Sequence, residues 1–293
     1  MRSPSLANFL RFLLVPEWRR RAILRRRRHA PVSQRLEYDA LGRNDYAYGM
    51  YHAARQAKAL GITTVTGIEF GVFNGIGLRN MEQLGYGIHQ ELGVWYDLYG
   101  FDTGAGLPPP SDRRDLAYVW KTGLFAPRRD LRTFLKRAGL VIGDVAQTVP
   151  RFCREKHAPL AFVSIDVDYY TAAADCLRIF DQDPSALLPR VFTYLDDTIG
   201  GDEELHSRFA GELAAVEEFN ARHEHRKIAP INGLRWKRRF PQAWNDQMHV
   251  AHIFDHPRYG DYTGGDPRWE QPAFEPAPVV VKVAPGRATA KTG

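Results

Sequence analysis

The fold is decided by the stretch Val65-Thr66-Gly67-Ile68-Glu69-Phe70-Gly71-Val72-Phe73-Asn74-Gly75-Ile76-Gly77. Its first six residues form a short apolar run that predicts a buried strand, and a helix is expected near residues 78–84. Glycines at 71, 75 and 77 place a turn between the two. A turn of this kind lets a ligand approach the backbone beside a helix N-terminus, so the stretch predicts a binding loop. A tight strand–helix turn that binds nothing would show the same pattern.

The spacing of these glycines differs from that of two common nucleotide-binding motifs. It does not match the Gly-x-Gly-x-x-Gly of dinucleotide-binding folds, and no Gly-Lys-Ser/Thr follows, as it would in a P-loop. A nicotinamide dehydrogenase is therefore disfavoured, because the chain also shows no evident partner for a hydride site.

Strand and helix patterns alternate along the rest of the chain. Such alternation predicts an α/β fold, here a Rossmann-like, doubly wound, mostly parallel sheet. Two strand patterns then occur without a helix between them, which predicts an antiparallel C-terminal strand pair. We expect strands at 65–70, 94–101, 140–142, 160–165, 191–195, 226–236 and 248–254, and helices at 44–60, 78–84, 131–138, 172–180 and 203–223.

A single carboxylate, Asp102, closes the second predicted strand. In folds of this class, a carboxylate at that place accepts hydrogen bonds from the ribose hydroxyls of a nucleoside-containing cofactor. The glycine-rich run that follows it, through Gly106, fits a loop lying over a ligand. The alternative is an aspartate that only caps a helix or a turn.

Four carboxylates follow two strands that are expected to be neighbours. Asp166 and Asp168 come after one strand, and Asp196 and Asp197 come after the next. The carboxyl ends of such strands form the ligand-binding edge of an open α/β sheet. Four clustered anions repel one another unless a proton or a cation intervenes, and Mg²⁺ prefers oxygen ligands. The pattern therefore predicts a metal site, although aspartates at strand ends also cap helices.

The histidines give a weaker signal. His206 follows the aspartate pair, and His249, His252 and His256 lie near the predicted C-terminal strand. On a strand, residues 249 and 252 face opposite sides, so we expect packing or substrate contact rather than a zinc site.

The composition is that of a globular chain. It has 293 residues, 44% of them apolar and 25% charged, which excludes a mainly disordered, collagen-like or coiled-coil protein. Two cysteines, Cys153 and Cys176, are too few for a disulfide framework or a four-cysteine zinc site. They favour a reducing compartment, so a cytoplasmic location is expected. No apolar run approaches the roughly 20 residues that span a bilayer.

The net charge of +6 is concentrated at one end of the chain. The first 30 residues contain nine arginines and one glutamate, a net charge of +8, which leaves −2 for the remainder. We predict a basic N-terminal arm (1–43), a main domain (44–260) and a Pro/Gly-rich C-terminal tail (261–293). The arm has the pattern of an amphipathic segment for an anionic membrane surface. A helix that packs on its own domain, or on a second subunit of a homo-oligomer, would have the same pattern. A nucleic-acid partner is disfavoured, because the rest of the chain is not basic.

Taken together, the motifs resemble those of class I S-adenosylmethionine-dependent methyltransferases, and most closely those of the macrocin O-methyltransferase family. The likeness covers about residues 65–220 and depends on four motifs in order. They are Glu69-Phe70-Gly71-Val72-Phe73-Asn74-Gly75; Phe101-Asp102-Thr103 with Gly106-Leu107-Pro108; Ile165-Asp166-Val167-Asp168-Tyr169-Tyr170-Thr171; and Asp196-Asp197 with Ala215-Val216-Glu217-Glu218-Phe219.

The resemblance implies a function and a role for each site residue. It implies transfer of a methyl group from S-adenosylmethionine to a hydroxyl of a small molecule or sugar, with a divalent cation, Mg²⁺, and an aspartate base. Asp168 would be the catalytic base. The metal would be bound by Asp166, Asp196 and Asp197, and the cofactor by Glu69, Gly71, Gly75, Asp102 and Asp144.

Two parts of the chain depart from the family pattern: the basic arm, and the extension after about Trp244. Since both would shape the acceptor pocket, the resemblance does not name the acceptor. A second hypothesis keeps the fold but not the chemistry: a nonenzymatic binding protein, attached to a membrane surface or an assembly through its arm.

Overall fold

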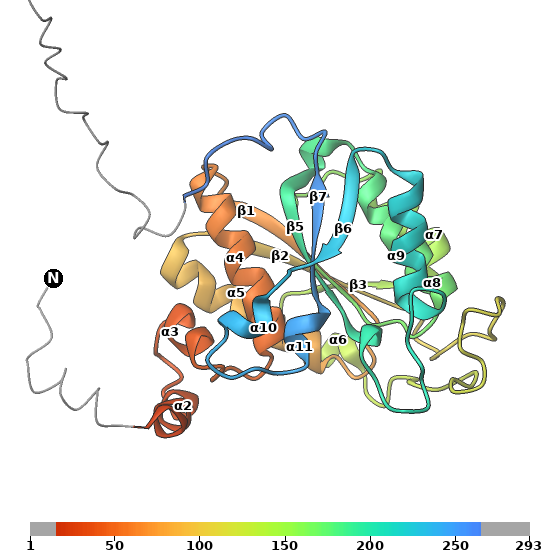
Figure 1. Ribbon diagram of the computed structural model, residues 1–293, viewed down its shortest axis with the longest axis horizontal. Helices are drawn as coiled ribbons and strands as arrows, with labels where there is room; N and C mark the ends of the chain where they lie inside the picture. The colour runs from red at the N-terminus through yellow and green to blue at the C-terminus, as the bar shows by residue number, and fades with distance from the viewer. Residues whose placement is uncertain (1–15, 265–293) are drawn as a thin grey trace, which may run out of the picture. The chain divides into compact units, whose positions relative to one another are not determined.

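The computed structural model describes residues 16–264 of the chain, which divides into two units after Tyr262. The described part of the first unit contains one seven-stranded sheet with the order β3-β2-β1-β4-β5-β7-β6 (Figure 1). The first five strands are parallel, and β7 runs antiparallel to both β5 and β6. The predicted fold class is therefore confirmed. The strands are β1 Thr64–Phe70, β2 Trp95–Asp102, β3 Gly139–Ile142, β4 Leu160–Ile165, β5 Leu187–Leu195, β6 Arg226–Pro230 and β7 Met248–Ile253.

Helices cover both faces of the sheet, with α4 and α5 on one side and α7, α8 and α9 on the other (Figure 1). This is the doubly wound arrangement, in which the strand order reverses between β1 and β4. The helices are α2 Glu17–Arg26, α3 Val32–Glu37, α4 Asn44–Ala59, α5 Ile76–Leu92, α6 Leu131–Phe134, α7 Val145–Phe152, α8 Tyr170–Leu177, α9 Gly211–Arg222, α10 Leu234–Lys237 and α11 Trp244–Gln247.

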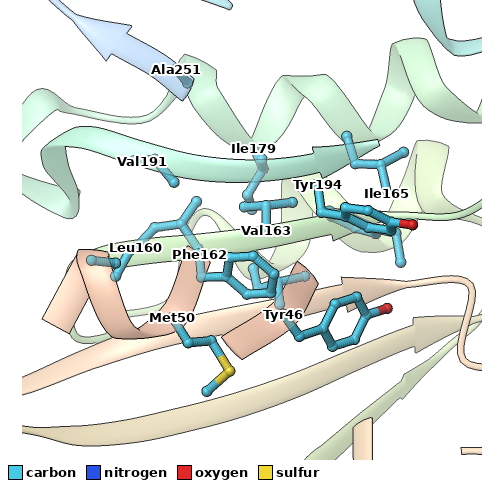
Figure 2. Packing of buried hydrophobic residues seen from close by; sticks show 14 of the residues in the cluster. Tyr46, Met50, Leu160, Phe162, Val163, Ile165, Ile179, Val191, Tyr194 and Ala251 are labelled. Carbon is cyan, nitrogen blue, oxygen red and sulfur yellow. The ribbon is translucent and has the colours of Figure 1, made fainter. Parts of the chain in front are cut away.

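The core lies between α4 and the middle of the sheet, where all six residues of β4 are buried. Tyr46 and Met50 of α4 lie against Phe162 of β4 (Figure 2). The ring of Phe162 stands 5.6 Å from that of Tyr46 and comes so close to Gly49 that a side chain there would collide with it. This close approach of α4 to β4 fixes the helix over the strands that carry the predicted site.

Three expected elements are shorter than predicted. The helix expected at 203–223 begins only at Gly211, because residues 202–210 form turns in which Leu205 and Phe209 are exposed. The helix expected at 131–138 ends at Phe134, since the next backbone N–H groups turn toward Glu82 Oε1. The strand expected at 226–236 ends at Pro230: the Ile231 N–H makes one more bond, to Met248 O at 3.0 Å, and the chain then turns into α10.

The described part of the arm, from residue 16, packs on the body. Leu24 of α2 is buried with Tyr38 and Ala40, and Val32 and Leu36 of α3 join the main core. The first 15 residues of the predicted arm and the predicted tail from 265 onward lie outside the described residues. Among the helices of residues 16–264, none is long and apolar enough to cross a membrane.

Candidate active site

A cavity of about 490 Å³ opens at the carboxyl edge of the parallel strands. Its floor comes from the turn after β1, the end of β2, the turn after β3 and the segment after β4. The loop 103–130, between β2 and α6, contributes its outer wall. The cavity thus occupies the place predicted for a ligand in an open α/β sheet. The site residues predicted from the sequence that line it are Gly71, Asp102, Asp144, Asp166 and Asp168.

Gly71 lets β1 and β4 end side by side. Its backbone has φ of +83°, and a Cβ there would lie 1.7 Å from the carbonyl oxygen of Asp166. The Gly71 N–H donates to Phe101 O at 2.9 Å, and the Asp166 N–H donates to Phe70 O at 3.1 Å. The sequence places glycine here because no other residue fits both the conformation and the space.

Asp102 holds the glycine loop in place through its carboxylate. Oδ2 accepts the N–H groups of Val72 (3.0 Å) and Phe73 (2.9 Å), and Oδ1 accepts that of Gly104 (2.7 Å). Because a carboxylate has about four acceptor positions, one remains on Oδ1 for a ligand hydroxyl. Asp102 therefore lies at the predicted place and also shapes the loop around it, which the sequence did not indicate.

Glu69 lies beneath the cavity instead of lining it. The side chain is fully buried, and Oε1 accepts the hydroxyl of Tyr46 at 2.7 Å, which itself accepts from Ser164 Oγ at 2.8 Å. Burial raises the pKa of Glu69 to about 7. Its contact with Gly77 places it against the start of α5, so it supports the loop from behind. Its role toward a cofactor remains a prediction, as does that of Gly75, which caps α5 in a left-handed conformation.

Asp144 caps helix α7 at the cavity wall. Its Oδ1 accepts the N–H of Ala146 at 2.9 Å, and the residue lines the cavity together with Val145. Asp144 thus lines the same cavity as Gly71 and Asp102. One oxygen is used by the helix, and direct contact with a cofactor remains a prediction.

The predicted aspartates meet at the ends of β4 and β5, where Ile165 pairs with Leu195. The Asp168 N–H donates to Asp197 Oδ2 at 2.9 Å, which ties the two strand ends together. Tyr194 donates its hydroxyl to Asp196 Oδ1 at 2.6 Å.

The pKa values of Asp166, Asp168 and Asp197 are raised. Burial, followed by repulsion from Asp197 and Asp196, raises the pKa of Asp168 to about 8. Burial and the neighbouring carboxylates also raise the pKa of Asp166 well above its usual range. Asp168 is further held at φ of +60°, an unfavourable conformation of a kind that often marks functional sites.

A fifth carboxylate, Glu212, joins this group and was missed by the sequence analysis. It is fully buried at the start of α9, and its oxygens accept the N–H groups of Asp197 (3.1 Å) and Val167 (3.5 Å). The signal was present: Glu212 stands four and seven residues before Val216 and Phe219, on the apolar side of the helix.

Within residues 16–264, the histidines form no group that could hold a metal ion. His249 contacts Gln247 O, His252 contacts Tyr259 Oη, and His256 Nδ1 accepts the N–H of Arg258, so each has a different partner. Packing roles are thus the better interpretation. His206 lies apart from them, with a side chain only 5% exposed and 2.9 Å from Glu204 Oε2. A charge on its ring would lower the pKa of Asp197, so it lies near the aspartates.

The donor set suits a hard divalent cation, although the side chains are not gathered around one point. Burial and the neighbouring carboxylates raise the pKa values of Asp166 and Asp197, and the Asp166 carboxylate accepts no hydrogen bond from residues 16–264. Oxygen ligands with uncompensated negative charge are what Mg²⁺ binds. Within residues 16–264, however, no three His, Cys, Asp or Glu side chains stand close enough to hold an ion as placed.

The loop 103–130 is fastened to the opposite wall by two further residues. Asp115 is fully buried and accepts the N–H groups of Ser111 and Thr171, each at 2.9 Å. Arg114 donates to Glu218 at 2.6 Å and stacks 3.6 Å from the ring of Tyr170. These contacts join the loop to α8 and α9, so they keep it over the cavity.

Comparisons with known proteins give a likeness only to solved structures. No family model matches the chain, and no curated protein matches it. The calicheamicin methyltransferase CalS11 is 20% identical, over 86% of this chain and 94% of that one, with a TM-score of 0.44. The O-methyltransferase NovP is 15% identical, over 71% and 79%, with a TM-score of 0.48. An O-methyltransferase from Bacillus cereus, in complex with SAH, is 10% identical, over 69% and 78%, with a TM-score of 0.35. At these scores the likeness adds no argument to the strand order and the cavity.

Proposed function

We propose that the chain is an S-adenosylmethionine-dependent O-methyltransferase that acts on a hydroxyl of a small molecule or sugar. The observation that carries this is one continuous cavity that reaches from the Gly71 turn and Asp102 to Asp166 and Asp168. The first end suits a nucleoside-containing cofactor, since Asp102 has an acceptor position left for a ribose hydroxyl. The second end suits an acceptor that must lose a proton. The motif order that resembles the macrocin O-methyltransferase family supports the same assignment.

Asp168 is the proposed general base. As the substrate oxygen forms its bond to the methyl carbon, the bond from that carbon to the sulfonium sulfur breaks and its electron pair stays on sulfur. The hydroxyl proton passes to the Asp168 carboxylate. A base whose pKa is about 8 holds the proton well and is still partly ionised near neutral pH. Asp168 is buried at the carboxyl end of β4 and lines the cavity, so a substrate hydroxyl in the cavity would lie within its reach.

Asp166, Asp196 and Asp197 are the proposed ligands of a divalent cation, expected to be Mg²⁺. Such an ion, when bound, lowers the pKa of a coordinated hydroxyl and orients it. Tyr194 and Glu212 support these residues, because Tyr194 donates to Asp196 and Glu212 accepts the N–H of Asp197. The side chains would have to turn toward one point on binding.

Calorimetry with S-adenosylmethionine tests the cofactor, and Asp168→Asn tests the base. We expect the protein to bind S-adenosylmethionine, and Asp102→Ala to weaken that binding at least about tenfold by freeing the glycine loop. Asp168→Asn should abolish methyl transfer, measured with a panel of hydroxyl compounds, and leave cofactor affinity nearly unchanged.

The outcomes separate the proposal from its alternative. Absence of cofactor binding with Mg²⁺ present would favour a nonenzymatic binding protein on the same fold. Full turnover by Asp168→Asn would remove Asp168 as the base while leaving the cofactor assignment in place.

A further inference from the structure

Helix α2 is fixed to the body along one side. Leu24 is buried against Tyr38 and Ala40, and Arg21 Nε donates to Asp39 O at 3.1 Å. The position of the helix is therefore set by contacts, and its other side is presented to solvent as a defined surface.

That outer side combines apolar and cationic side chains. Trp18 is 62% exposed and Ile23 is 45% exposed, although residues of this kind are usually buried. Helical spacing places exposed arginines around them on the same side of the helix. We call this the α2 outer face, formed by Trp18, Arg19, Ala22, Ile23, Arg25 and Arg26.

The positive charge of the α2 outer face is not neutralised within the described chain. Glu17, the one acid of the helix, pairs with Arg239 at 2.8 Å. The arginines at 19 and 25–28 form no ion pair with a carboxylate of residues 16–264. Burial and, after it, the charge of Arg28 lower the pKa of Arg35, so positive charges lie near one another at the end of α2.

An anionic membrane surface matches both properties of this face. Arginines gain from the negative potential of the headgroups, while Trp and Ile side chains gain from the boundary between headgroups and hydrocarbon. The phosphates of a nucleic-acid duplex would account for the arginines and would leave the exposed Trp18 and Ile23 without a contact. We propose that the α2 outer face binds an anionic lipid bilayer and holds the protein peripherally on it. This attachment is independent of the proposed methyl transfer.

Sedimentation of the full chain with vesicles tests the proposal without any activity measurement. We expect binding to mixed phosphatidylcholine–phosphatidylglycerol vesicles, little binding to phosphatidylcholine alone, and weaker binding at high salt. Replacing both Arg25→Gln and Arg26→Gln should weaken binding about tenfold. The pair Trp18→Ser and Ile23→Ser should weaken it as well, even at low salt, because apolar contact is lost.

A matched control uses two exposed arginines on and after α7. Arg151→Gln with Arg154→Gln removes the same charge far from α2 in the sequence and should leave vesicle binding unchanged. Equal weakening by this control would overturn the proposal, since it would mean that net charge alone drives binding. Absence of vesicle binding, or binding insensitive to the Trp18 and Ile23 pair, would overturn it too. Unchanged thermal unfolding of each variant shows that the fold is retained.

Discussion

At the scale of single residues, the structure depends most sharply on Gly71. We predict that Gly71→Ala destabilises the protein by at least about 3 kcal/mol, because the added Cβ must push the backbone of Asp166 away. Cofactor binding should be lost along with it, since the same backbone shapes the cavity. Urea unfolding measures the first effect and calorimetry the second.

Gly93 provides the matched control for this substitution. It also has a positive φ, +76°, but an added Cβ there meets nothing within 4 Å. Gly93→Ala should therefore lower the free energy of unfolding by only about 1 kcal/mol, because alanine is less stable than glycine in the left-handed conformation. Similar decreases in the free energy of unfolding for the two variants would contradict the close approach of β1 and β4.

The residues of the site differ in how well the sequence predicted them. Asp102, Asp166 and Asp168 could be placed at strand ends because strand ends are visible as breaks in apolar runs. Glu212 and Asp115 were not predicted, since each acts by accepting backbone N–H groups from segments distant in sequence. The local spacing puts Glu212 on the apolar side of its helix, but the groups that it contacts there depend on the tertiary fold.

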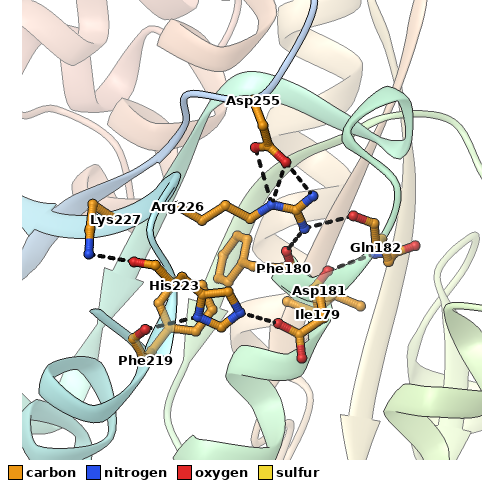
Figure 3. Close-up of polar contacts among 9 residues, drawn as sticks. All are labelled: Ile179, Phe180, Asp181, Gln182, Phe219, His223, Arg226, Lys227 and Asp255. Carbon is orange, nitrogen blue, oxygen red and sulfur yellow. Dashed lines mark hydrogen bonds and ion pairs between the residues drawn. The ribbon is translucent and has the colours of Figure 1, made fainter. Parts of the chain in front are cut away.

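At the scale of elements, Arg226, the first residue of the edge strand β6, joins the sheet to the segment that follows α8 (Figure 3). Its guanidinium donates to the carbonyls of Phe180 and Gln182 and forms an ion pair with Asp255 at 2.9 Å. Because the side chain is only 11% exposed, we predict that Arg226→Ala costs about 3 kcal/mol by leaving these acceptors unpaired. Thermal or urea unfolding would measure the loss.

Arg178 is the control for the Arg226 substitution. Its ion pair with Asp175 lies on the surface, with 43% of the arginine side chain exposed, so Arg178→Ala should change stability by less than about 0.5 kcal/mol. Arg226→Lys should fall between the two, because one ammonium cannot replace the planar fork of the guanidinium. If Arg226→Ala lowers the free energy of unfolding no more than Arg178→Ala does, the proposed role of Arg226 is wrong.

The elements were predicted correctly where the hydrophobic pattern determines the structure. They were mispredicted where a polar contact with a distant residue, or a turn with exposed apolar side chains, takes the place of a helix. Strand β4 is buried throughout and was placed correctly. The helix expected at 131–138 failed because Glu82 accepts three successive backbone N–H groups that a helix would have used. The helix expected from 203 failed because apolar side chains at 205 and 209 match the helical spacing yet stay exposed in turns.

At the scale of the whole molecule, burial shifts acids and histidines in opposite directions. The pKa of Asp168 is raised from 3.8 to about 8, so the native state holds a proton that the unfolded chain releases, and stability falls as pH rises through this window. Burial lowers the pKa of His52 from 6.5 to about 4, so its contribution is complete above pH 6.5 and is lost as pH falls toward 4. Between about pH 4 and 6.5 the two effects oppose each other, and above pH 6.5 only the loss from Asp168 remains, so stability falls on the alkaline side.

We therefore predict that a divalent cation changes the alkaline side of this profile alone. Without one, Tm should fall between pH 6 and about pH 9, because the clustered aspartates ionise against one another. Millimolar Mg²⁺ should reduce that fall, since it favours the ionised carboxylates, and should have little effect near pH 5.5, where protons compete for them. His52→Gln should alter the acid side and leave the Mg²⁺ response unchanged. An equal Mg²⁺ shift of Tm at both pH values would mean that the ion binds elsewhere, because exposed surface carboxylates stay ionised across this range.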